Sequence, residues 1–252
     1  MTIALLTLSF VVPANAHAQG NERFARWALH DGLSLVERSL PLVPAVLVAG
    51  GLVIPAAKHF DEPLLDEVQN SYHGVWGDYL DFTNDLGDPY VLIPATSVFA
   101  VSLFTGSERF QDAAFTSVES LLFATAITGT IKQMVGRSRP QENIGSIRLR
   151  PFSGNASFPS GHVTAAFALV TPWVYYYPGP ATYSLFALSG GTAIARIARD
   201  KHWPTDVLAG AAIGFLTSRW LARRHLSSAN QPPVSIRPVL GYNSLGLTID
   251  IP

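Results

Sequence analysis

The stretch from Ala195 to Gly210, ARIARDKHWPTDVLAG, contains three polar residues whose types and spacing could do chemistry. His202 precedes Asp206 by four positions, so the carboxylate can hold one ring nitrogen while the other is left free to attack. Arg196 adds a planar guanidinium that suits an anion. Pro204 favours the first turn of a helix, where the helix dipole would favour Asp206. The stretch indicates a nucleophile, its partner and an anion clamp; the simpler alternative is a surface helix start with an incidental ion pair.

Two further basic residues, Lys132 and Arg139, lie in the segment KQMVGRSRP. Their separation of seven positions corresponds to two helical turns, which predicts that both lie on one face of a helix that Pro140 ends. Such a pair can bind an anion. Taken alone, it is also typical of side chains that interact with a helix end or extend along an apolar surface.

The segment Phe158-Pro159-Ser160-Gly161-His162 precedes an apolar stretch that is predicted to be helical. Ser160 is expected to be the N-cap, so the amide of Gly161 and those that follow would be free hydrogen-bond donors. A helix start of this kind binds phosphate, and His162 would add a proton donor beside it. The alternative is an ordinary helix cap with an incidental histidine.

Together these residues predict a phosphoryl-transfer site, because that reaction depends mostly on positioning and on stabilising charge on the phosphoryl oxygens. One histidine would attack phosphorus and the other would protonate the leaving group. The predicted phosphate-binding residues are Lys132, Arg139, Ser160, Gly161 and Arg196. Apart from Asp206 the polar set is cationic, so we expect neither a metal site nor a cofactor.

The three motifs K-x6-RP, PSGH and R-x5-H-x3-D, in this order from Lys132 to Asp206, resemble those of the type 2 phosphatidic acid phosphatase (PAP2) family. That family also includes bacterial acid phosphatases and vanadium haloperoxidases. The resemblance implies that His202 is the nucleophile, with Asp206 as its partner and His162 as the general acid. The resemblance also implies that Lys132, Arg139, Ser160, Gly161 and Arg196 bind the phosphate. It implies that vanadate inhibits the enzyme, because vanadate mimics phosphate. One departure is Ala195, where the family usually has serine.

The expected function is therefore a metal-independent phosphatase that hydrolyses phosphomonoesters, in particular lipid phosphates or pyrophosphates, through a phosphohistidine. Three alternatives stay open. They are a secreted non-specific acid phosphatase acting on soluble esters, a vanadate-dependent haloperoxidase and a non-catalytic membrane protein of the cell envelope.

The amino-acid composition and the N-terminal sequence indicate the environment in which the protein works. Of the 252 residues 48% are hydrophobic and only 14% are charged, against a usual quarter, so the chain is either extensively buried or partly in lipid. The net charge of −1 gives no basic surface for nucleic acid, and the absence of cysteine excludes disulfides. Residues 1–18 are expected to be a signal peptide, because a short apolar run precedes small-x-small cleavage sequences. The mature protein would then be extracytoplasmic, in the periplasm or cell envelope.

The predicted fold is an all-α bundle of about six core helices over residues 19–230, followed by a tail over residues 231–252. Alternating apolar residues in the tail predict a short β-hairpin. Residues 58–88 are polar and acidic and are interpreted as a solvated linker. Residues 39–57 and 89–107 carry no charge, and together with residues 113–131 they are the candidate membrane spans. A membrane-associated bundle is favoured, and a soluble bundle is the alternative. Helices are expected over residues 21–38, 110–135 (with an interruption at Glu119), 160–177, 181–200 and 204–225.

Overall fold

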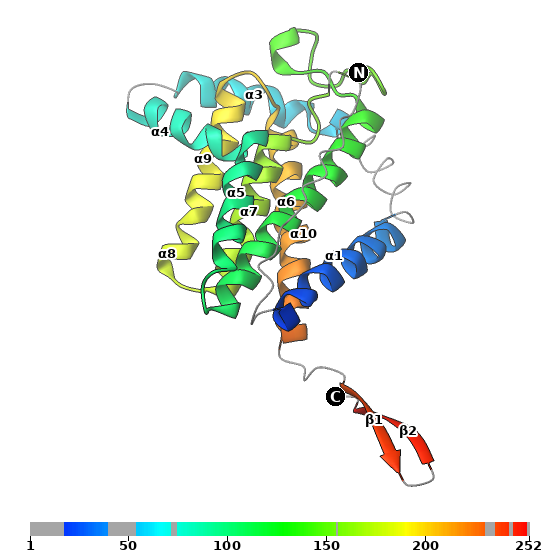
Figure 1. Cartoon of the computed structure of the whole chain (residues 1–252). Helices are drawn as coiled ribbons and strands as arrows, with labels where there is room; N and C mark the ends of the chain where they lie inside the picture. Colours follow the sequence, from blue (N-terminus) through cyan, green and yellow to red (C-terminus); the bar gives the residue numbers. More distant parts are fainter. Residues whose placement is uncertain are drawn as a thin grey trace. The chain divides into compact units, whose positions relative to one another are not determined.

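The computed structural model describes residues 18–39, 54–71, 75–154, 156–229, 235–241 and 244–250 (Figure 1). The chain forms two compact units, residues 1–40 and residues 41–252. The described part of the first unit is one helix, α1 (Ala18–Ser39), as the sequence predicts for residues 21–38. The expected signal peptide, up to residue 17, and most of the first uncharged run, residues 40–53, lie outside the described residues.

In the second unit, all described elements before residue 230 are helical (Figure 1). The all-α prediction is thus confirmed for the described part of the domain, which contains about nine helices when α1 is included. The α-helices of the second unit are α3 (Lys58–Asn70), α4 (Val75–Asn84), α5 (Leu92–Ser102), α6 (Glu108–Val135), α7 (Gly161–Tyr176), α8 (Pro180–Tyr183), α9 (Leu185–Ala198) and α10 (Pro204–Ala229). Three short 3-10 turns join them, at η2 (Asp85–Gly87), η3 (Pro89–Val91) and η4 (Pro140–Glu142).

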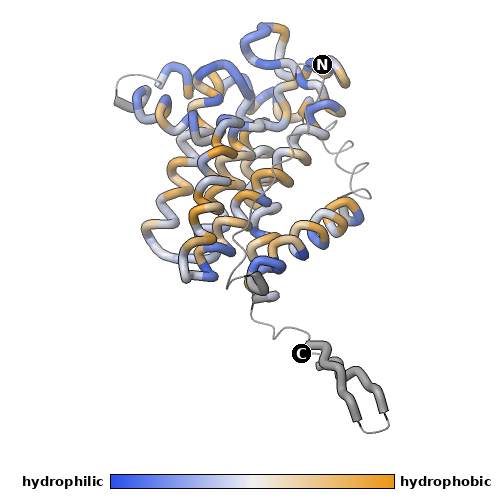
Figure 2. Tube along the Cα trace, in the orientation of Figure 1, coloured by the Kyte–Doolittle hydropathy of each residue, from blue (hydrophilic) through white to orange (hydrophobic). Residues whose placement is uncertain are grey.

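Helix α7 packs against α6, α9 and α10, and it is apolar along its length (Figure 2). Two glycines of α10 let that helix approach α7 closely. A Cβ atom at Gly210 would lie 2.5 Å from the carbonyl oxygen of Ser160, and one at Gly214 would lie 2.4 Å from that of Thr164. Small residues at a helix crossing allow the backbones to pack directly. This contact fixes the first turn of α10 beside the first turn of α7.

The prediction of a solvated linker over residues 58–88 is wrong. The segment forms α3, α4 and η2, and α3 and α4 both contact α9. The apolar side chains of Leu65 and Leu80 are buried, and so is the carboxylate of Asp61. The helices were not predicted because the segment is acidic and its apolar side chains are widely spaced. The buried Asp61 is paired with Arg137, which lies far away in the sequence.

The second uncharged run does not form one long helix. It contains η3, the 11-residue α5 and a turn, and α5 is too short to cross a bilayer, which takes about 20 helical residues. By length and composition, α6 is the candidate membrane span among the described helices. It runs without a break through Glu119, so the predicted interruption there is wrong.

The described residues of the tail form two antiparallel strands, β1 (Ser235–Gly241) and β2 (Ser244–Asp250). Their register pairs Ser235 with Asp250 and Gly241 with Ser244.

Candidate active site

The three motifs meet where α6 and α9 end and where α7 and α10 begin. The backbone amide of Ser160 donates to the carbonyl of Asp206 (2.9 Å), which joins the second motif to the third. The Lys132 ammonium, in the last turn of α6, donates to the carbonyls of Ala156 (2.9 Å) and Ser157 (3.3 Å). The first motif therefore lies directly against the segment that leads into α7.

Arg139 is not on a helix face with Lys132, which corrects the sequence-based prediction. Helix α6 ends at Val135, and Gly136 adopts a left-handed conformation (φ 59°) that turns the chain away. A Cβ atom there would lie 1.9 Å from the carbonyl oxygen of Arg150, so only glycine fits. The backbone amide of Arg139 donates to Glu142 (3.0 Å), which fixes the following turn. The charge of Arg139 nevertheless acts on Lys132, His162 and Arg196, so it belongs to the same cluster.

Ser160 occupies the N-cap position of α7, but its side chain does not cap the helix. Its hydroxyl is buried and has no hydrogen-bond partner within the described part of the chain. The next residue, Gly161, has its Cα facing Lys132, since a Cβ there would lie 3.6 Å from the lysine Cε. The first-turn amides of α7 and an unused hydroxyl thus lie beside an ammonium group, which suits an oxyanion.

Arg196 lies in the last turn of α9 and is 8% exposed. Its guanidinium donates to the side-chain oxygen of Asn84 at 3.1 Å, while its Nε has no partner among the described residues. Asn84 was not predicted, and no spacing in the sequence links it to a residue more than a hundred positions away. It orients the guanidinium and leaves other donors for a ligand.

His202 is 2% exposed, and its Nδ1 lies 3.8 Å from Asp206 Oδ2 and 3.4 Å from the hydroxyl of Ser157. At 3.8 Å these two atoms are too far apart for a direct hydrogen bond, and they form an ion pair only when the imidazole is protonated. Because Nδ1 is the ring nitrogen nearest to Asp206, Nε2 is directed away from the carboxylate. Burial lowers the pKa of His202 to about 4, an effect that Asp206 opposes and the charges of Lys132 and Arg196 reinforce. The imidazole is therefore neutral at pH 7, which is the form in which a histidine can act as a nucleophile.

Asp206 is fully buried, and its carboxylate accepts three hydrogen bonds. They come from Arg137 Nη1 (2.6 Å), the hydroxyl of Ser157 (2.5 Å) and the backbone amide of Trp203 (2.9 Å). Burial raises the pKa of Asp206, but His202, Arg137 and Ser157 together hold it below its usual value. The carboxylate therefore stays ionised, with a fixed orientation next to His202.

Arg137 is the main residue that sequence reasoning missed. It is fully buried and forms ion pairs with Asp206 and with Asp61, each at 2.6 Å. Its Nε donates to the carbonyl of Ser146 (2.7 Å), and Asp61 also accepts from the backbone amide of Thr205 (2.9 Å). The available signal was a second arginine two positions before Arg139. Its partner Asp61 lies in the stretch interpreted as a linker, so the pair was not predicted.

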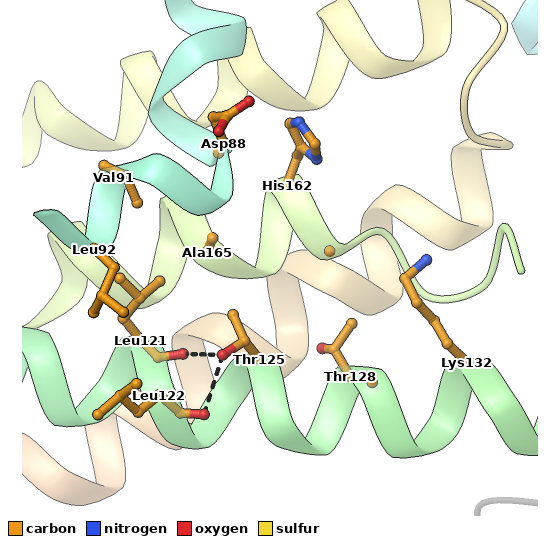
Figure 3. A pocket seen from close by; sticks show the side chains of 13 residues that line it. Asp88, Val91, Leu92, Leu121, Leu122, Thr125, Thr128, Lys132, His162 and Ala165 are labelled. Carbon is orange, nitrogen blue, oxygen red and sulfur yellow. Dashed lines mark hydrogen bonds between the residues drawn. The ribbon is translucent and has the colours of Figure 1, made fainter. Parts of the chain in front are cut away.

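A cavity of about 330 Å³ opens beside this cluster (Figure 3). Its polar lining includes Lys132, His162 and Asp88, and Gly161 also lines it. It extends between α5, α6 and α7 along apolar side chains, those of Val91, Leu92, Leu121, Leu122 and Ala165. His162 thus faces the cavity. Burial and the charge of Arg196 lower its pKa to about 4, while Asp88 opposes that shift.

Comparison with known proteins agrees with this arrangement. The family model of the PAP2 superfamily matches residues 113–228, which include all three motifs. The chain belongs to the PAP2 superfamily. A PAP2-type phosphatidylglycerolphosphate phosphatase from Bacillus subtilis, known by crystal structure, has a similar fold, with a TM-score of 0.51 and 17% identity over 75% of this chain and 98% of that one.

Two curated relatives of this PAP2 protein are lipid A 1-phosphatases. That of Rhizobium etli is 32% identical over 100 residues, which are 38% of this chain and 43% of the relative. That of Porphyromonas gingivalis is 42% identical over 73 residues, which are 27% of this chain and 16% of the relative. The chain therefore spans less than half of either relative.

Proposed function

We propose that this chain is a metal-independent phosphatase that removes the phosphate of a lipid phosphomonoester or pyrophosphate through a phosphohistidine. The observation that carries the proposal is the apolar cavity that begins at Lys132, Gly161 and His162. A soluble ester has no use for an apolar channel beside the leaving-group side of the site. A lipid alkoxide would place its hydrocarbon there, because burial of apolar surface favours binding.

In the first half-reaction, the phosphoryl group would bind to the cationic cluster of Lys132, Arg139 and Arg196 and to the Ser160–Gly161 turn. Neutral His202 would attack phosphorus through Nε2, and the P–N bond would form as the bond to the ester oxygen breaks. Protonated His162 would give its proton to that oxygen, and the alcohol would leave along the cavity. Binding of the phosphate dianion raises the pKa of His162, because an opposite charge favours the imidazolium.

In the second half-reaction, His162 is neutral and would take a proton from water as the water oxygen attacks phosphorus. The P–N bond would break and its electron pair would return to His202. Inorganic phosphate would leave, and His162 would be protonated again, ready for the next substrate. Asp206 would stabilise the charged form of His202 in both steps, while Arg137 and Ser157 hold the carboxylate in place.

Lipid substrates are supported by the names of the relatives, which are lipid A 1-phosphatases and a phosphatidylglycerolphosphate phosphatase. Membrane association is supported by α6, a candidate span, and by exposed apolar side chains on the neighbouring helices, such as Val98, Val101 and Leu216. Location in the cell envelope, with an extracytoplasmic active site, fits the apolar N-terminal sequence.

For the organisation of the chain we propose a signal peptide over residues 1–18, the phosphatase domain over residues 19–230 and a tail with a hairpin over residues 231–252. About six of the helices would form the core of the domain. Mass spectrometry of the purified protein tests the first boundary, which requires a mature N-terminus near Gln19; an intact Met1 would contradict it.

The activity is tested by phosphate release from a long-chain lipid phosphate, its short-chain analogue, an aryl phosphate and a pyrophosphate, with detergent present. We expect the long-chain lipid to have the highest kcat/KM.

Replacing Leu122, which lines the cavity, by tryptophan should raise KM for the long-chain substrate and leave KM for the short-chain substrate unchanged. The matched control is Leu216→Trp, at an exposed leucine of α10 outside the cavity. Equal rates on all chain lengths, unaffected by Leu122→Trp, would contradict the lipid assignment.

The absence of a metal requirement is tested separately. Activity should survive a chelator and be inhibited by vanadate, which mimics the trigonal bipyramidal phosphoryl group. Loss of activity in chelator that a divalent cation restores would contradict the metal-free mechanism.

A further inference from the structure

A carboxylate that the three motifs do not contain is among the groups that line the cavity. Asp88 lies between η2 and η3, and its side chain is drawn next to the imidazole of His162 among the residues that line the cavity (Figure 3). The two residues come from segments 74 positions apart in the sequence. No spacing rule in the motifs predicts that they meet.

The backbone next to Asp88 is fixed against His162. Gly87 is buried, and a Cβ atom there would lie 2.4 Å from the carbonyl oxygen of His162 and 2.6 Å from its Cβ. Glycine is therefore needed for this approach, since any larger residue would displace backbone. On the other side, Asp88 Oδ1 accepts a hydrogen bond from the amide of Tyr90 (2.9 Å), which restrains the carboxylate.

The other charged groups around His162 are mostly positive. Lys132 comes from α6, Arg139 from the segment after it and Arg196 from α9, and all three charges disfavour the imidazolium. Across α10, Asp206 is engaged by Arg137 and lies next to His202. Asp88 is thus the carboxylate whose charge favours the protonated form of His162. A general acid must carry a proton before it can give one to the leaving group.

From this geometry we infer that Asp88 is a positioning residue for His162: its carboxylate, held in the lining of the same cavity as the imidazole, favours the protonated form of His162 until the leaving group accepts the proton. The inference rests on the proposed function, because it assigns His162 to the leaving group. In the reaction Asp88 itself neither forms nor breaks a bond. The proton passes from His162 to the ester oxygen, and the imidazole regains one from water in the second step.

The test compares Asp88→Asn, His162→Ala and the double variant on an alkyl phosphate and on an aryl phosphate. General acid catalysis contributes about 10²–10⁴, so Asp88→Asn should lower kcat on the alkyl ester about tenfold and change KM little. On the aryl ester, whose leaving group needs little protonation, the loss should be within about twofold. In the His162→Ala background, Asp88→Asn should have no further effect, because its action passes through the missing imidazole. The control is Asp78→Asn, an exposed acid of α4.

The charge of Asp88 also favours the protonated form of Arg196. An effect of Asp88→Asn on the rate could therefore arise through Arg196 instead of His162. If it served Arg196 or the substrate headgroup, Asp88→Asn would add its full effect to His162→Ala, would lower the rate equally for both leaving groups and would raise KM. Any of these results overturns the inference. They leave the proposed function intact as long as His202→Ala is inactive and wild-type protein releases phosphate.

A measurement that does not depend on turnover tests the role of Asp88 separately from the proposed phosphatase activity. Histidine-selective NMR of the full chain in detergent, with the His162 signal identified from His162→Ala, should show its titration midpoint lowered by about half a unit or more in Asp88→Asn. Asp88→Glu should restore part of that shift. An unchanged midpoint would overturn the inference even if no substrate were hydrolysed.

Discussion

At the scale of residues, the site is built from charged groups whose orientation depends on uncharged or distant partners. Asn84 holds one side of Arg196, and Ser157 and Arg137 hold Asp206. The motif residues could be found in the sequence because their types and spacing are themselves the signal. Their partners could not be predicted, because nothing in the sequence indicates which side chain an asparagine, a serine or a further arginine will contact.

Arg196→Lys should therefore be damaging although the charge is kept. Lysine cannot bind the amide oxygen of Asn84 and present a planar pair of donors at the same time. Loss of one donor to a developing oxyanion costs roughly 10²–10³ in rate. The measurement is kcat/KM for lipid phosphate, with Arg199→Lys as the control. Arg199 is three positions along the same helix end and pairs with Asp81 at the surface. A near-normal rate for Arg196→Lys would show that this arginine does not contact the phosphate.

At the scale of elements, the site depends on the close crossing of α7 and α10. Gly214 packs on the carbonyl of Thr164, and a Cβ atom there would also lie 3.0 Å from the amide nitrogen of Ala168. Because these are backbone atoms of a helix, they cannot shift one at a time. A Cβ atom at Gly214 would therefore force α7 and α10 apart. Their first turns carry His162 and Asp206, which links this packing to the geometry of the site.

Gly214→Ala should lower the free energy of unfolding by about 1–3 kcal/mol, the usual effect of overpacking. The control is Gly190→Ala in α9, where a Cβ atom would meet nothing within 4 Å. That change should be neutral or stabilising by up to about 1 kcal/mol, because alanine is the better helix former. Both values are obtained from denaturant unfolding in detergent. Equal stabilities for the two variants would contradict the close crossing.

Most helices of the bundle could be predicted from the sequence. Apolar runs bounded by proline and glycine locate α6, α7, α9 and α10 to within a few residues. The region of residues 58–88 could not be predicted in this way. Its many acids resemble a solvated segment, and only the tertiary structure shows that Asp61 is buried against Arg137 and that Asp88 faces the cavity. Likewise Lys132 and Arg139 have helical spacing, but Gly136 ends the helix between them.

At the scale of the whole molecule, the buried site makes stability depend on pH. The pKa of His202 is about 4 in the folded protein, below its ordinary value of 6.5. Between these values the unfolded chain binds a proton that the folded protein does not, so stability is complete above pH 6.5 and falls as the pH is lowered toward 4. Asp206, whose folded pKa is also lowered, adds a loss at still lower pH.

For His202 the loss between pH 6.5 and 4 amounts to roughly 3 kcal/mol, from 1.36 kcal/mol for each pKa unit. Denaturant unfolding at pH 7, 6 and 5 should therefore show decreasing stability for the wild type. His202→Asn should show a shallower dependence, because the titrating group is gone. A slope that His202→Asn leaves unchanged would mean that this histidine is not protected from protonation in the folded protein.

The central claim is that His202 forms the covalent bond to phosphorus while His162 serves the leaving group. The most direct measurement is to mix the protein with ³²P-labelled lipid phosphate, to stop the reaction in alkaline denaturant, which preserves phosphohistidine, and to map the labelled peptide. We expect label on His202, none in His202→Ala, and label that accumulates in His162→Ala with an aryl phosphate, because water is then activated poorly. Label on His162, or label that persists in His202→Ala, would contradict the account.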